Sequence, residues 1–181
     1  MTFPKGSGLQ LSTPSFASGG YSLVMLFRLS DLSSYRRIFG AGTAGLTFTN
    51  DNGLYAHDSK MAIYDNTAGA ANPFQSPGPL FVPNTYAEVA LTVPDSKATK
   101  VTAYFNGSKV VDEAPDTDQF NAAGMRFFKD NDGTSSTEDS GGAVGRIRIF
   151  SGQLTPQEVS STFSSSPRPG WCWKRFGVPV D

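Results

Sequence analysis

Apolar and polar side chains alternate with a period of two along several short segments of this 181-residue chain. In segment 21–29, read as YSLVMLFRL, five large apolar side chains share one face. A period of two is that of a β-strand, whereas an amphipathic helix repeats about every 3.6 residues. The same alternation recurs in segments 86–93, 101–105 and 143–150. The chain is therefore predicted to be all-β, with about nine to eleven short strands.

Turn-forming residues separate the predicted strands. Asn106-Gly107 marks a hairpin, and Asp51-Asn52-Gly53 marks a second one, because Asn and Gly tolerate the positive φ angles of tight turns. The stretch 65–83, rich in Pro, Gly and Asn, predicts an ordered surface loop. One short helix is predicted to begin at Thr155, where the order Thr-Pro-Gln-Glu fits a capping box. Many short strands with one terminal helix predict an antiparallel two-sheet sandwich.

Composition excludes several classes of protein. A single Cys precludes an internal disulfide, and a single His argues against multi-histidine metal sites and a Ser-His-Asp triad. Fifteen Lys and Arg nearly balance sixteen Asp and Glu, so no nucleic-acid partner is expected. No apolar run is long enough to predict a transmembrane segment, and residues 1–10 lack the pattern of a secretory signal.

Several motifs in the second half of the chain resemble one family. VTAYFNGSKV, at 101–110, reads as strand, Asn-Gly turn and strand, and GAVGRIRIF is followed within a few residues by LTPQEV. Together these motifs resemble the closing hairpin, last strand and helix of laminin G-like domains in the concanavalin A-like lectin/glucanase superfamily. The resemblance implies a jelly-roll sandwich over residues 1–163. It also implies an extracellular or exported location.

The same resemblance implies binding more often than catalysis, with a glycan or a protein surface recognised by loops at a sheet rim. The catalytic relatives, the glucanases, carry paired carboxylates in the order Glu-x-Asp-x-x-Glu on one strand. None of the four glutamates, at 88, 113, 138 and 158, stands in that pattern. The chain is therefore predicted not to be an enzyme. A structural subunit of a larger assembly is the alternative.

Five residues are candidates for ligand binding. The adjacent Arg36 and Arg37 could bind a carboxylate or sulfate through planar guanidinium groups; the alternative is one exposed and one salt-bridged arginine. The rings of Tyr55, His57 and Tyr64 could stack on a sugar, or could fill the sandwich and anchor the long loop.

An acidic loop follows the predicted strand that ends near Phe128. Asp130, Asp132 and Glu138 offer the hard oxygen ligands that Ca²⁺ prefers. The alternatives are a solvated turn, which Asp and Asn favour, and a structural role for Glu138 as a buried acceptor. Calcium is thus the one cofactor that the sequence predicts.

Residues 164–181 are predicted to form a Ser/Pro hinge and an aromatic-basic tail. Trp and basic residues suit docking to a partner or a membrane interface, but the tail could equally pack on its own sandwich. The candidate docking residues are Trp171, Trp173, Lys174, Arg175 and Phe176.

Overall fold

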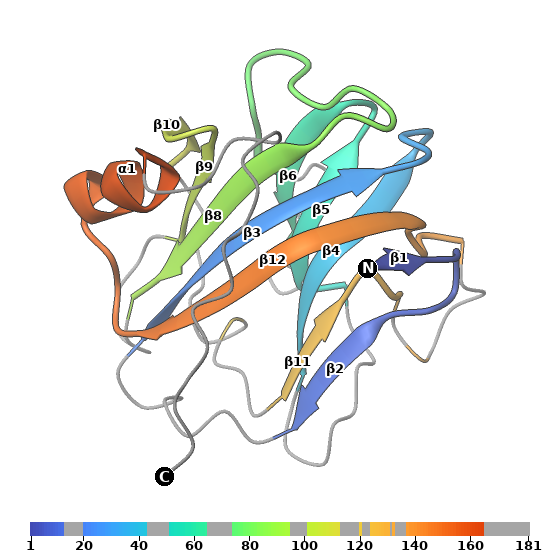
Figure 1. Ribbon diagram of the computed structural model, residues 1–181, viewed down its shortest axis with the longest axis horizontal. Helices are drawn as coiled ribbons and strands as arrows, with labels where there is room; N and C mark the ends of the chain where they lie inside the picture. The colour runs from blue at the N-terminus through green and yellow to red at the C-terminus, as the bar shows by residue number, and fades with distance from the viewer. Residues whose placement is uncertain are drawn as a thin grey trace, which may run out of the picture.

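Two six-stranded antiparallel sheets lie face to face (Figure 1), which confirms the predicted jelly-roll sandwich. The computed structural model describes residues 1–12, 20–42, 51–64, 74–94, 101–112, 120, 124–130, 132 and 137–164. In spatial order, the first sheet contains β1 (Thr2–Phe3), β12 (Gly142–Ser151), β3 (Tyr21–Leu29), β8 (Ala87–Val93), β9 (Thr102–Phe105) and β10 (Ser108–Val111). The second contains β2 (Leu9–Ser12), β11 (Gly124–Phe127), β4 (Tyr35–Gly42), β5 (Gly53–His57), β6 (Lys60–Tyr64) and β7 (Phe74–Gln75).

The hydrophobic core fills the space between the sheets. Alternate residues of β3, including Leu23, Met25 and Phe27, face inward and are fully buried. They meet inward residues of the second sheet such as Phe39 and Leu54. The alternation seen in the sequence thus sets which face of each strand is buried.

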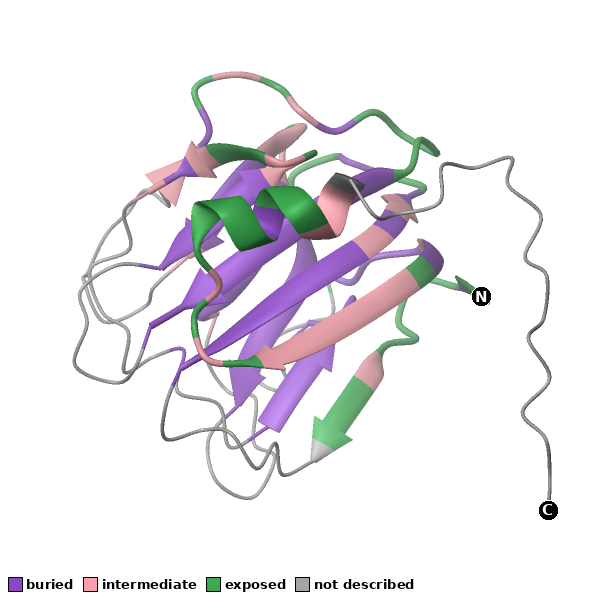
Figure 2. Ribbon diagram, turned by 60° about the vertical axis from the view of Figure 1, so that its left-hand side comes forward, coloured by how far each residue is buried: buried purple, intermediate pink, exposed green. Residues whose placement is uncertain are grey.

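Part of the outer face of the first sheet is covered by the helix of the same chain, while Leu26 on this face remains half-buried. Helix α1 (Pro156–Ser164) lies across this sheet (Figure 2), where Val159 packs on Val24, Ala90 and Tyr104. Thr155 and Glu158 cap the helix reciprocally: the Thr155 amide donates to the Glu158 carboxylate, and the Glu158 amide donates to the Thr155 hydroxyl. The predicted capping box is therefore confirmed, and the apolar side chain of Val24 is not left for a partner.

Twelve strands form in the described part of the chain, more than the sequence predicts. The two-residue strands β1 and β7 are too short to show any periodicity, and β7 lies inside the segment predicted as a loop. Residues 43–50, which would contain the first strand of the hairpin predicted at Asp51-Asn52-Gly53, lie outside the described residues. No helix among the described residues combines the length and apolar character needed to cross a membrane.

Candidate functional site

A β-bulge in β4 turns one arginine to the outer face of the second sheet. Pairing between β4 and β5 shifts between Arg37 and Phe39, so Ile38 and Phe39 both enter the core while Arg37 points away from it. A Cβ atom at Gly40 would lie 2.8 Å from Arg37 Nη1. A larger residue at Gly40 would therefore displace the guanidinium.

Arg37 lies at the centre of a cluster of carboxylates. Its Nη2 atom is 3.1 Å from Asp51 Oδ1, 3.4 Å from Asp130 Oδ1 and 3.8 Å from Glu138 Oε2. The Arg37 and Asp130 side chains are each only 1% exposed, and the guanidinium also lies 4.8 Å from the centre of the Tyr55 ring. Arg37 therefore joins three segments: its own strand β4, the residues just before β5, and the segment 130–138.

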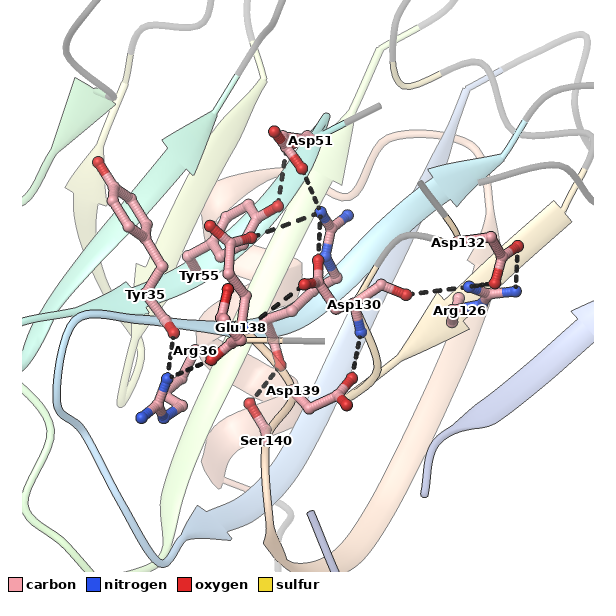
Figure 3. Close-up of polar contacts among 12 residues, drawn as sticks. Tyr35, Arg36, Asp51, Tyr55, Arg126, Asp130, Asp132, Glu138, Asp139 and Ser140 are labelled. Carbon is pink, nitrogen blue, oxygen red and sulfur yellow. Dashed lines mark hydrogen bonds and ion pairs between the residues drawn. The ribbon is translucent and has the colours of Figure 1, made fainter. Parts of the chain in front are cut away.

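Backbone contacts hold the segment that carries Glu138 against β4. The Arg37 amide donates to the Glu138 carbonyl over 2.9 Å, and the Ser140 hydroxyl donates to the Arg37 carbonyl over 2.7 Å. Asp139, which is buried, accepts a 2.7 Å hydrogen bond from the Asp130 amide. Figure 3 shows Asp51, Asp130 and Glu138 close together, with the Asp139 carboxylate turned toward the Asp130 backbone.

A pocket of about 150 Å³ opens beside this cluster. Three tyrosines and two carboxylates line it: Tyr35, Tyr55, Tyr64, Asp51 and Glu138. The Tyr55 hydroxyl donates to the Asp51 carbonyl over 3.0 Å, and the rings of Tyr35 and Tyr64 each meet the Tyr55 ring edge-on. The pocket thus combines flat apolar rings with acidic hydrogen-bond acceptors.

The His57 ring holds the Tyr35 ring in place from one side. The His57 ring stacks on it with centroids 3.8 Å apart and an interplanar angle of 3°, and His57 Nδ1 lies 2.7 Å from Gln75 Nε2. His57 therefore supports a pocket wall and does not itself line the pocket.

Glu138 titrates at an unusual pH for a carboxyl group. Burial raises its pKa to about 7, and the nearby Asp130 and Asp51 carboxylates act in the same direction, against the opposing effect of Arg37. Near neutral pH the group can therefore accept or donate a proton.

The two arginines predicted as ligand-binding residues are both buried. Arg36 is held by Asp31 and by the carbonyl oxygens of Tyr35 and Thr137. The pKa of Asp31 falls to about 2, chiefly because the Ser33 amide donates to it, with Arg36 assisting. Arg36 therefore forms an internal salt bridge, but neither arginine is exposed, whereas the alternative expected one of the two to be.

The predicted metal ligands separate into two groups. Asp130 and Glu138 join Asp51, and one oxygen of each lies within 4.8 Å of the others, which makes these three a possible metal-binding group. Asp132 instead pairs with Arg126 through contacts of 2.7 and 3.0 Å. Sequence reasoning missed Asp51 because it assigned the residue to a turn. It also missed Tyr35, although Tyr35 and Arg37 are two apart on one strand and so share a face.

A second, shallower cavity of about 300 Å³ lies between the β9–β10 hairpin and the start of α1. Its lining includes Tyr104, Lys109 and Asp112, but none of the residues predicted to bind a ligand. The predicted docking residues Trp171, Trp173, Lys174, Arg175 and Phe176 lie outside the described residues.

The antiparallel sandwich with a pocket on its outer face defines a lectin-like domain of the jelly-roll class. Residues 3–160 match the family described as the concanavalin A-like lectin/glucanases superfamily, and the chain belongs to that family. The resemblance inferred from the sequence is confirmed. A search of curated proteins by sequence found no match.

Solved structures share this fold at low sequence identity. The CBM40 domain of the Ruminococcus gnavus IT-sialidase, bound to α2,3-sialyllactose, is 16% identical with a TM-score of 0.66, over 90% of this chain and 95% of that one. NanB sialidase from Streptococcus pneumoniae is 19% identical with a TM-score of 0.65, over 88% of this chain. A Trypanosoma rangeli sialidase is 17% identical with a TM-score of 0.65, over 90% of this chain. The match spans 27% of each of these two sialidase chains.

Proposed function

We propose that this domain is a non-catalytic recognition module that binds a glycan in the pocket lined by Tyr35, Tyr55, Tyr64, Asp51 and Glu138. The observation that carries this proposal is the meeting of tyrosine rings and carboxylates in one cavity on a sheet face. Binding sites for small ligands are concave and use a few precisely placed polar groups to fix the orientation of the ligand. The neighbouring CBM40 structure bound to sialyllactose supports a glycan as the kind of ligand.

The chemistry of the pocket suits a sugar ring. A pyranose has C–H groups that can lie on an aromatic face and hydroxyl groups that can donate to carboxylates. The volume of about 150 Å³ is below the roughly 300–1,000 Å³ of pockets for drug-sized ligands. We therefore propose that one sugar unit enters the pocket and that the rest of the glycan remains outside.

Replacing Tyr64 with Ala should weaken glycan binding by about five- to twelvefold, because loss of one aromatic wall costs on the order of 1–1.5 kcal/mol. A glycan array would identify ligands, and titration calorimetry would compare the variants. Tyr86→Ala is the matched control, since Tyr86 is 40% exposed and precedes β8 of the other sheet. Equal losses in both variants, or none in Tyr64→Ala, would contradict the proposed site.

We propose that the Arg37 guanidinium, and not Ca²⁺, is the cation that pairs with the carboxylates at this site. Ca²⁺ takes roughly six to eight oxygen ligands, but Arg37 already lies within 3.8 Å of an oxygen of each of the three carboxylates. The residues present therefore do not fit a calcium ion while Arg37 occupies this position.

Millimolar Ca²⁺ should consequently leave the melting temperature unchanged relative to a chelator. A ligand that binds only the folded state must stabilise it, so thermal unfolding detects calcium directly. A melting temperature that rises with Ca²⁺ in the wild-type chain, but not in Glu138→Gln, would restore calcium as the ligand of this cluster.

Glycan cleavage is the second candidate, favoured by the raised pKa of Glu138 beside Asp51. A retaining glycosidase places its two carboxyl groups about 5–5.5 Å apart with both open to the substrate. Here the carboxylate oxygens lie within 4.8 Å of one another, with Arg37 bound to them. We therefore expect bound glycans to remain intact over long incubation. Release of new reducing ends that is lost in Glu138→Gln would establish an enzyme instead.

A further inference from the structure

The charge of the pocket sets which sugars can enter it. Asp51 and Glu138 both line the pocket and remain accessible, with 36% and 26% of their side chains exposed. The nearest cation, Arg37, is almost completely buried and already paired with both of them. A ligand in the pocket therefore meets carboxylates and tyrosine rings, while the guanidinium stays behind them.

None of the other cations described on this face lines the pocket. Arg126 forms an ion pair with Asp132, and Arg36 forms an ion pair with Asp31. Lys60 lies opposite His57 in the β5–β6 ladder, at the other end of β6 from Tyr64. The sequence segments that lead into or out of the pocket residues, 43–50, 65–73 and 133–136, contain no Lys, Arg or His. Neither the described lining nor these segments supply a free cation for an anionic ligand.

The geometry points to selection by charge: the pocket accepts sugar units that are neutral or carry a protonated amine, and it rejects units that carry a carboxylate or sulfate. This inference rests on the proposed function. A hydroxyl or ammonium group donates hydrogen bonds to Asp51 and Glu138, whereas an anion would repel both in a partly desolvated site. The raised pKa of Glu138 agrees with this repulsion, because burial and the neighbouring carboxylates already disfavour a negative charge on Glu138 itself.

The test uses matched sugars that differ in charge at one position. Glucose, glucuronic acid and glucosamine form one series, and galactose, galacturonic acid and galactosamine form another; each is presented as a glycoside on one surface. At least one neutral or amino member should bind, and the corresponding uronic acid should bind at least about tenfold more weakly, because like charges across an interface are strongly unfavourable. Glu138→Gln and Asp51→Asn should each reduce this discrimination. Asp112→Asn, in the second cavity, should leave it unchanged.

The outcomes distinguish a failure of charge selection from a failure of the proposed glycan site. If a uronic acid binds as tightly as its neutral partner, and Tyr64→Ala weakens both equally, the proposed site holds and charge selection is overturned. If discrimination persists undiminished in Glu138→Gln and Asp51→Asn, these carboxylates are not its source and the inference also fails. If no member of either series binds, the proposed function fails together with this inference.

Discussion

Replacing Arg37 with Met should lower the free energy of unfolding by about 3–5 kcal/mol, because it leaves the Asp130 carboxylate buried without its counter-charge. Asp51 and Glu138 would also face each other without the guanidinium between them. Urea denaturation measures the loss. Because Arg37 joins three segments of the chain, the loss of stability in this variant tests the whole cluster.

Two further variants show whether charge is the cause. Combining Arg37→Met with Asp130→Asn should recover part of the loss, since the unpaired buried charge is then removed. Lys109→Met is the control, because Lys109 and Asp112 form an exposed ion pair that solvent screens and that adds little to stability. Similar losses in Arg37→Met and Lys109→Met would contradict the account of the cluster.

Phe27→Ala should destabilise the chain by about 3–5 kcal/mol, as truncation of a large core aromatic does. Phe27 is fully buried on β3, with ring centroids 6.1 Å from Phe81 and 5.3 Å from Phe128. The substitution would therefore open a cavity between the two sheets. Chemical denaturation compares it with Val82→Ala, whose side chain is 59% exposed and should change stability by at most about 0.5 kcal/mol. A loss below about 1 kcal/mol for Phe27→Ala would mean that the assigned inward face is wrong.

The fold could be predicted because short stretches of the sequence determine its main strands and its helix. The alternation in segment 21–29 fixes one strand and its buried face, and the Thr155–Glu158 capping box fixes the start of the helix. The family resemblance then ordered these elements into a jelly roll. Two-residue strands such as β7 could not be predicted, because they are defined only by pairing with a neighbour, here β6.

The site was only partly predictable because its residues converge from distant segments. Tyr55, Tyr64, Arg37, Asp130 and Glu138 were candidates, and the structure gathers all five in or beside one pocket. The bulge that separates Arg37 from the core is a property of strand pairing and has no single-residue signal. Asp51 joins the cluster from two positions before β5, fourteen positions after Arg37. Its distance from Glu138 in space could not be inferred from either local sequence.

The central claim is that a sugar occupies the tyrosine-walled pocket on the second sheet, and a crystal structure with the tightest-binding neutral or amino sugar tests it most directly. We predict a sugar ring in contact with Tyr35 and Tyr64, with hydroxyl or ammonium groups donating to Asp51 or Glu138. A sugar bound instead in the cavity between the β9–β10 hairpin and α1, with the tyrosine pocket empty, would contradict the account.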